Sequence, residues 1–225
     1  MRMRKKKNLD VRFAACADVM AFEPKEKRGK WRALFGNDNP IHLEIGCGKG
    51  RFTAETAQQH PDTLYIALER VPDAMIVAME RCMDKGLTNV FFIDANADQL
   101  PLFFAPGEAD RIYINFCDPW PSNRHAKRRL THGNFLQLYR RVLPMGGEIH
   151  FKSDNDKLFE WSLEEIPRFG FRLSQVTRDL HADGPVGVMT DYEAKFYQQG
   201  VTINRCVAIM VPWETPAQPE ESEEA

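Results

Sequence analysis

Short apolar runs alternate along the chain with longer amphipathic stretches, and this alternation constrains the fold more than any other feature. Runs rich in Val, Ile, Leu and Phe predict buried strands, and apolar residues three and four positions apart predict helices. Strands are expected at residues 41–45, 64–68, 90–93, 111–116, 148–152, 171–176 and 204–210. Helices are expected at residues 51–59, 72–85, 133–142 and 157–168, with C-terminal stops at Gly86 and Gly170. The pattern predicts an α/β fold, a mostly parallel seven-stranded sheet with helices on both faces.

The charge of the chain is unevenly distributed. The formal net charge is −2, but five glutamates lie after Cys206, so residues 1–205 hold 30 basic against 27 acidic side chains. Basic residues cluster within the first twelve positions and again at 124–129. Such clusters fit either a solvated run or an RNA-binding surface. We expect a basic, partly disordered arm at 1–36, one domain at 37–213 and an acidic, disordered tail at 214–225.

The sequence indicates neither a membrane-spanning segment nor a metal site. No apolar run is long enough to span a bilayer, and the basic start lacks the apolar segment of a signal peptide, so a cytoplasmic protein is expected. The five cysteines are odd in number, widely spaced and form no C-x-x-C pair. Neither a disulfide framework nor a metal site is therefore expected.

The first predicted strand leads into the sequence LEIGCGKG. Gly46, Gly48 and Gly50 allow a tight turn that brings backbone N–H groups close to a ligand at the start of the next helix. A dinucleotide fingerprint would need glycine at position 51, where the chain has arginine, and this disfavours pyrophosphate. Glu44 suits a cationic ligand instead, such as the sulfonium and ammonium groups of S-adenosylmethionine. A purely structural turn is the alternative.

Polar residues also follow the second and third predicted strands. Glu69 lies 25 residues beyond Glu44, where a carboxylate can accept hydrogen bonds from both ribose hydroxyls of an adenosine. After the third strand, the candidates to contact an adenine edge are Asp94, Asn96 and Ala97, and Asn96 is favoured because its amide both donates and accepts. The alternatives are a helix-capping carboxylate for Glu69 and a turn-forming role for Asn96.

The fourth predicted strand leads into NFCDPWPSNRHAKRRL. Asp118 stands at its carboxyl end, and Pro119 and Pro121 stiffen the backbone around Trp120. A rigid acidic loop beside a nucleotide pocket indicates a pocket for a target base, although core packing could also explain the prolines and tryptophan. The residues that follow would bind the flanking phosphates. They are Arg124, His125, Ala126, Lys127, Arg128 and Arg129.

Three further motifs follow along the chain: GEIHFKSDN, DLH and TDYEAKF. Together and in this order, the motifs resemble those of the bacterial tRNA (guanine-N7)-methyltransferases. The match runs from about residue 41 to residue 209. It implies a Rossmann-like class I methyltransferase sheet, S-adenosylmethionine as methyl donor, and a guanine in the variable loop of tRNA as acceptor. It also implies donor binding by Glu44, Glu69, Asn96 and Asp118, with Asp118 at the catalytic centre as well.

The resemblance further implies contacts between the substrate guanosine and a second group of residues, Asp154, Thr190, Asp191, Tyr192 and Glu193. Residues 190–193 also match a capping box at the start of a helix, so both interpretations stand. The chain has Ser122 where the family commonly has a substrate-contacting lysine, so that contact is either lost or made by a neighbour such as Arg124 or Lys127. No obligate protein partner is expected, whether the protein is a monomer or a homodimer. The rival functions are methylation of another RNA or DNA base and non-catalytic RNA binding.

Overall fold

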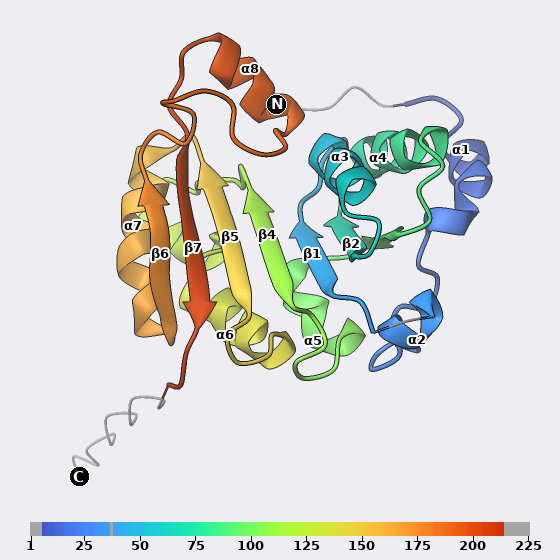
Figure 1. The fold of residues 1–225 in the computed structure, drawn as a ribbon, viewed down its shortest axis with the longest axis horizontal. Coiled ribbons are helices and arrows are strands. Elements are labelled where there is room, and N and C mark those ends of the chain that lie inside the picture. The colour runs from blue at the N-terminus through green and yellow to red at the C-terminus, as the bar shows by residue number, and fades with distance from the viewer. Residues whose placement is uncertain (1–5, 37, 214–225) are drawn as a thin grey trace.

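The computed structural model describes residues 6–36 and 38–213, and its seven strands form a single sheet. The strands are β1 (Ile41–Ile45), β2 (Leu64–Glu69), β3 (Val90–Asp94), β4 (Arg111–Asn115), β5 (Glu148–Ser153), β6 (Phe171–Thr177) and β7 (Asn204–Met210). Their order is β3-β2-β1-β4-β5-β7-β6, and β7 runs antiparallel to both of its neighbours (Figure 1). The predicted mostly parallel seven-stranded sheet is confirmed, and every predicted strand lies within one residue of its observed bounds.

Helices cover both faces of the sheet. They are α1 (Leu9–Ala15), α2 (Trp31–Phe35), α3 (Arg51–Gln59), α4 (Pro72–Asp84), α5 (Leu100–Phe103), α6 (Gly133–Val142), α7 (Asp156–Arg168) and α8 (Asp191–Gln198). In Figure 1, α3 and α4 lie in front of β1 and β2, whereas α6 and α7 lie behind the sheet. Gly86 and Gly170 follow α4 and α7 with φ of 64° and 74°, as their predicted role as stops requires.

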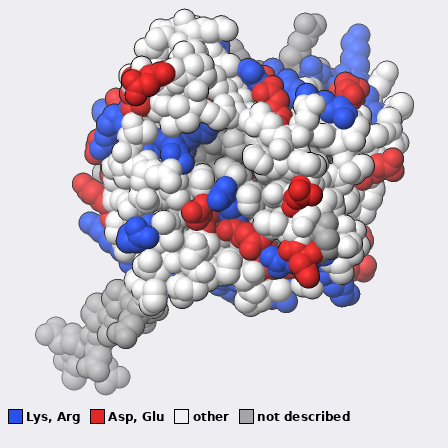
Figure 2. All heavy atoms as spheres, in the orientation of Figure 1, with Lys and Arg blue, Asp and Glu red and all other residues white. Residues whose placement is uncertain are grey.

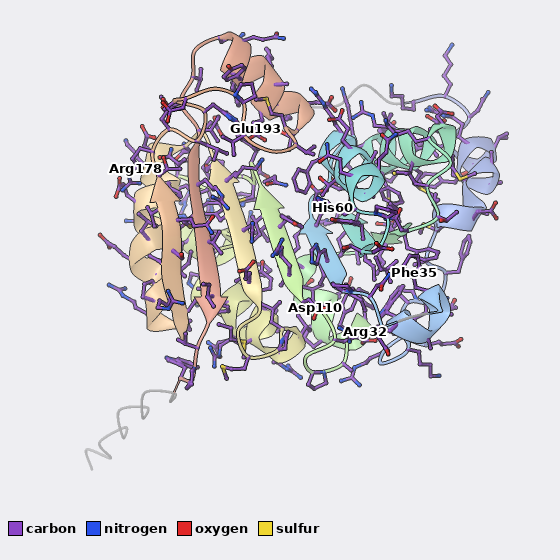
Figure 3. All side chains as sticks on the ribbon, viewed as in Figure 1. Arg32, Phe35, His60, Asp110, Arg178 and Glu193 are labelled. Atoms are coloured by element: carbon purple, nitrogen blue, oxygen red, sulfur yellow. The ribbon has the colours of Figure 1, made fainter. Side chains whose placement is uncertain are left out.

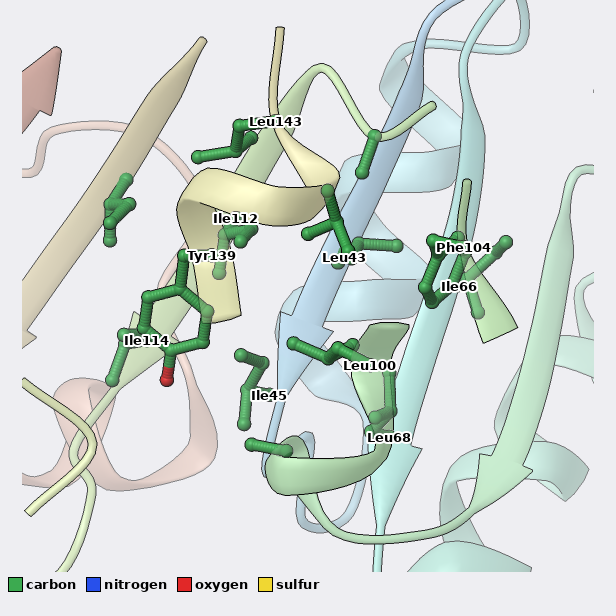
Figure 4. Packing of buried hydrophobic residues seen from close by; sticks show 14 of the residues in the cluster. Leu43, Ile45, Ile66, Leu68, Leu100, Phe104, Ile112, Ile114, Tyr139 and Leu143 are labelled. Atoms are coloured by element: carbon green, nitrogen blue, oxygen red, sulfur yellow. The ribbon is translucent and has the colours of Figure 1, made fainter. Parts of the chain in front are cut away.

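The main core lies between the sheet and the helices behind it. Its side chains come from the central strands β1, β2 and β4 and from α5 and α6, and they include Leu43, Ile66, Ile112 and Leu100 (Figure 4). All four are at most 1% exposed. Burial of large apolar side chains stabilises the fold by roughly 1.5–3 kcal/mol each. This packing fixes the central strands, and so fixes the points where the loops after them begin.

The segment 9–35 packs against the domain, although the sequence suggested an arm with at most local helix. Trp31 in α2 is fully buried, and its indole N–H donates to the carbonyl oxygen of Phe103 (2.8 Å). Beside it, Arg32 pairs with Asp110 at the amino end of β4 (2.7 Å; Figure 3). The part of the predicted arm that the structure describes is thus helical in places and held against the domain. The predicted acidic tail and the first five residues lie outside the described residues.

Charged side chains of both signs gather on the front face of the molecule, near the amino ends of β4 and β5 (Figure 2). Arg111 pairs there with Glu148 on the neighbouring strand (2.8 Å). Cross-strand pairs of opposite charge stabilise adjacent strands modestly. In the part of the chain that the structure describes, no helix has the length and apolar character needed to cross a membrane.

Candidate active site

The parallel strands β1, β2, β4 and β5 end at the same edge of the sheet, where α8 also lies (Figure 1). The loops after them carry the residues that the sequence singled out, because neighbouring parallel strands place their carboxyl ends side by side. Glu44 pairs in register with Ala67 of β2 and with Tyr113 of β4. One edge of the sheet therefore brings the glycine turn and the acidic loop together.

The glycine turn after β1 has the left-handed backbone that its sequence predicts. Gly46, Gly48 and Gly50 have φ of 77°, 57° and 71°. A Cβ at Gly50 would lie 2.4 Å from the Cβ of Ala78, so only glycine fits between the turn and α4. The backbone N–H of Gly48 donates to Glu69 Oε2 (2.9 Å). The turn is thereby tied to the end of β2.

Glu69 is held by backbone donors at the wall of the cleft. Its Oε1 accepts hydrogen bonds from the backbone N–H groups of Arg70 (2.7 Å) and Val71 (2.9 Å). Oε1 therefore already accepts two hydrogen bonds and Oε2 accepts one, so Oε2 keeps a lone pair for a ligand. Asn96 lines the same cleft, where its backbone N–H donates to Gln99 Oε1 (3.3 Å) in the turn that follows β3.

Glu44 is a buried carboxylate, only 3% exposed. It accepts hydrogen bonds from the Thr53 hydroxyl and from Asn115 Nδ2 (3.1 Å). Burial raises the pKa of Glu44, and these two hydrogen bonds oppose the rise. A carboxylate in such surroundings favours a cationic ligand nearby.

The Asp-Pro-Trp-Pro loop adopts a strained backbone. Phe116 and Trp120 both have left-handed φ values, 56° and 42°, which cost energy for residues other than glycine. Arg129 holds the loop in place, since its guanidinium donates to the carbonyl oxygen of Trp120 through Nε (3.3 Å) and NH2 (3.1 Å). The same guanidinium lies 4.5 Å from the centre of the Trp161 ring. The prolines alone did not reveal this support.

Two acidic side chains converge next to this loop. Asp118 follows β4, Asp154 follows β5, and both are exposed. Burial raises the pKa of Cys117 to about 12, and the negative charges of Asp118 and Asp154 add to the rise. Asp118 lines the larger of the two cavities along this edge, whereas Asp154 is not among its lining residues.

Two cavities open along this edge and share part of their lining. The larger, about 790 Å³, includes Glu69, Asn96 and Asp118 in its wall, and the smaller, about 330 Å³, includes Glu44 and Tyr192. Gly46, Asn115 and Phe116 line both. The larger cavity has the size of a nucleoside-containing ligand, since typical small-molecule sites measure about 300–1,000 Å³. The cleft thus has two compartments that share part of their wall.

The basic run forms a 3₁₀ turn, η3 (Asn123–Arg128), whose members differ in exposure. Arg124 and Lys127 are exposed, as is Ser122 before them, whereas His125 and Ala126 are half-buried. Arg128 is exposed but stacks over the Trp120 ring (4.8 Å). Arg129 is 5% exposed and committed to the loop, so the structure does not present it to RNA. The sequence pattern could not separate it from its neighbours.

The predicted substrate segment 190–193 begins α8 with a complete capping box. Thr190 Oγ1 accepts from the Glu193 backbone N–H (3.0 Å), and Glu193 Oε2 accepts from the Thr190 backbone N–H (3.1 Å). Asp191 pairs with Arg81 of α4 (3.1 Å), and Tyr192 is 57% exposed. Thr190, Asp191 and Tyr192 line the smaller cavity.

Glu193 differs from the other members of this segment because it is fully buried. Lys152 Nζ donates to Glu193 Oε2 (2.6 Å), and His181 Nε2 lies 3.1 Å from Glu193 Oε1. Figure 3 shows Glu193 where α8 meets the upper ends of the strands. The structure therefore does not bring Glu193 to a substrate, and the capping interpretation accounts for it. Lys152 and His181 were missed because their partners are distant in sequence.

No metal centre is evident in this arrangement. Across residues 6–36 and 38–213, no group of three His, Cys, Asp or Glu side chains is placed to hold a metal ion. What the cleft offers is a set of carboxylates and amides that suits a nucleoside carrying positive charge.

Known proteins resemble this chain along most of its length. A family described as "Putative methyltransferase" matches residues 38–206. A tRNA (guanine-N(7)-)-methyltransferase of Geobacillus kaustophilus is 47% identical over 213 residues, which cover 94% of this chain and 98% of that protein. A protein of the same name from Bacillus subtilis is 44% identical over 216 residues, 96% and 100% of the two chains.

Solved structures share the fold at low identity. The 16S rRNA methyltransferase KamB aligns with a TM-score of 0.60 at 14% identity, over 94% of this chain and 97% of that one. A SAM-dependent methyltransferase from Aquifex aeolicus aligns with a TM-score of 0.55 at 15% identity, over 92% and 100%. These likenesses establish the class I methyltransferase fold. The sequence matches carry the finer assignment, and the chain belongs to the tRNA (guanine-N(7)-)-methyltransferase family.

Proposed function

We propose that this protein transfers a methyl group from S-adenosylmethionine to N7 of a guanine in the variable loop of tRNA. Family membership supports the reaction, and one observation of the site carries it. Glu69, Asn96 and Asp118, from three different strand ends, line a single cavity beside the glycine turn. Because the proposed substrate is tRNA, we also propose a cytoplasmic location.

The residues of the cleft fit the proposed donor. Glu69 would accept hydrogen bonds from the ribose hydroxyls, and Asn96 would meet the adenine edge. Glu44, a buried carboxylate side chain, would face the cationic part of the molecule. When bound, S-adenosylmethionine supplies a methyl group attached to positively charged sulfur. The protein has to hold that group and the target base in fixed relation.

Guanine N7 carries an in-plane lone pair, so no proton has to leave the base before methyl transfer. The side chains therefore orient the guanine rather than deprotonate it. We propose that Asp118 and Asp154 accept hydrogen bonds from the guanine N1–H and exocyclic amine, and offset the positive charge that develops on the ring. Alignment of this kind lowers a bimolecular barrier by several kcal/mol. Tyr192, exposed at the rim, offers a face on which a base can stack.

The exposed cations of the basic run are proposed to bind tRNA phosphates. Replacing both Arg124 and Lys127 with alanine is expected to weaken tRNA binding and to reduce the slope of log Kd against log salt by about two, roughly one per lost phosphate contact. Binding of S-adenosylmethionine should not change. Filter binding of tRNA measures the slope at salt concentrations from about 50 to about 200 mM, a range over which affinity for nucleic acid falls strongly. If affinity for donor and tRNA falls together, the assignment is wrong.

Arg129 provides a matched control within the same run. Because its guanidinium is buried against the Trp120 carbonyl and the Trp161 ring, Arg129→Gln should lower the free energy of unfolding by about 1–3 kcal/mol. The salt slope for tRNA binding should stay at the wild-type value. Urea denaturation measures the first quantity and the same filter assay the second. A reduced salt slope with unchanged stability would instead place Arg129 on the RNA.

The proposed function is tested by locating the transferred methyl group. The purified chain is incubated with labelled S-adenosylmethionine and unmodified tRNA, and the product is treated with a reductant and then with aniline. N7-methylguanine makes the RNA backbone cleavable at that position, so one cut in the variable loop of the tRNA is expected. Label without cleavage would indicate another base or an exocyclic atom. No label at all, with tRNA still bound, would indicate a non-catalytic RNA-binding protein.

A further inference from the structure

Asn115 is the last residue of β4 and borders both compartments of the cleft. Its side chain is 7% exposed, although it belongs to a strand whose other buried side chains are apolar or aromatic. A buried amide needs partners for both its N–H groups and its oxygen, since an unpaired buried polar atom is costly. Where those partners are found decides what Asn115 does.

One half of the amide is already paired. Asn115 Nδ2 donates to Glu44 Oε1 (3.1 Å), and the other oxygen of Glu44 accepts from the Thr53 hydroxyl. A carboxylate accepts and an amide NH₂ donates, so this contact fixes which way the amide faces. Its carbonyl oxygen, Oδ1, is consequently turned away from Glu44.

The other half of the amide is unpaired. Asn115 Oδ1 is buried and has no hydrogen-bond partner within residues 6–36 and 38–213. Lys152, whose charge lowers the pKa of Glu44, donates instead to Glu193 (2.6 Å) and to the Val188 carbonyl (3.3 Å). Among the described residues, the Asn115 carbonyl oxygen thus has no donor and Glu44 has no cationic hydrogen-bond partner, and both residues line the smaller cavity with the glycine turn.

We propose that Asn115 Oδ1 accepts a hydrogen bond from the ammonium group of the amino-acid part of the methyl donor, with Glu44 supplying the opposite charge. This inference rests on the proposed function. An ammonium group has three donors and one positive charge, which matches an amide oxygen next to a carboxylate. Asn115 is thus a donor-binding residue in addition to those the sequence suggested.

Binding of three ligands tests the proposal without any turnover. S-adenosylmethionine and S-adenosylhomocysteine both carry the ammonium group, whereas 5′-methylthioadenosine lacks the amino-acid part. Asn115→Leu should weaken binding of the first two by about tenfold or more, since hydrogen bonds to charged groups are the strong ones. Binding of 5′-methylthioadenosine should change by less than about twofold. Isothermal titration calorimetry of the full chain measures all three dissociation constants.

Thr53→Val is the matched control, because it also removes one hydrogen bond from Glu44 but leaves the Asn115 oxygen in place. Thr53→Val should weaken the binding of the two ammonium-bearing ligands clearly less than Asn115→Leu does. Asn115→Ser, smaller and still polar, serves if the leucine variant does not fold. Equal effects of Thr53→Val and Asn115→Leu on ligand binding would overturn the proposal. So would an Asn115→Leu variant that binds only S-adenosylmethionine more weakly, or one that binds all three ligands more weakly. Failure of the wild-type chain to bind S-adenosylmethionine would instead refute the proposed function.

Discussion

Replacing Asp118 with alanine is expected to lower kcat/KM for methyl transfer by about 10²–10³-fold, the usual cost of removing one positioned polar group from a transition state. Asp118 lines the larger cavity at the end of β4, and its side chain is exposed. The free energy of unfolding should therefore change by less than about 0.5 kcal/mol.

Initial rates with labelled S-adenosylmethionine and varied tRNA give kcat/KM, and thermal unfolding gives stability. Asp84→Ala is a suitable control, since Asp84 is an exposed carboxylate at the end of α4 and lines neither compartment. That variant should keep wild-type activity. An Asp118→Ala enzyme within about tenfold of wild type would remove Asp118 from the catalytic centre.

Breaking the buried pair between Lys152 and Glu193 is expected to have the largest effect on stability. The two side chains are 10% and 0% exposed. Lys152→Met would leave the Glu193 carboxylate buried with only His181 and the Thr190 backbone N–H as partners, so the free energy of unfolding should fall by about 3–5 kcal/mol. Binding of tRNA should weaken as well, because Glu193 fixes the start of α8 and with it Thr190 and Tyr192.

Urea denaturation measures this loss, and an exposed pair supplies the comparison. Arg178 and Glu160 are 49% and 61% exposed at a similar separation of 2.7 Å, so Arg178→Met should cost about 1 kcal/mol or less. The double variant Lys152→Met/Glu193→Gln should recover part of the stability lost in Lys152→Met, since no buried charge is then left alone. A loss for Lys152→Met no greater than that for Arg178→Met would contradict the structural role given to the pair.

The strands and the main helices could be predicted because local pattern decides them. Apolar periodicity marks β1 to β7, and Gly86 and Gly170 mark where two helices stop. The segment 9–35 has no such periodicity, since its helices are short and irregular. Its position depends on distant contacts, such as the guanidinium of Arg12 with the carboxylate of Glu80 (2.6 and 2.5 Å), which no local pattern reveals.

The candidate site shows the same division. The glycine turn, Glu69 and Asp118 could be predicted because strand ends collect on one edge of a parallel sheet. The sequence at 190–193 fitted both a substrate-contacting segment and a helix capping box. Only the burial of Glu193 against Lys152 distinguishes the two interpretations for that residue. Arg129 was grouped with the RNA-binding cations because a sequence shows its charge but not its 5% exposure. Asn115 was missed because a single polar residue in a strand gives no signal until its partners are known.

The most direct test replaces one atom of the substrate. We consider a tRNA in which the variable-loop guanosine that receives the methyl group is exchanged for 7-deazaguanosine, which has C–H in place of N7 and no lone pair there. If the cleft presents N7 to the methyl donor, this tRNA should bind with nearly the wild-type dissociation constant and receive no methyl group. Methyl transfer to the altered tRNA at the wild-type rate would show that another atom is the acceptor.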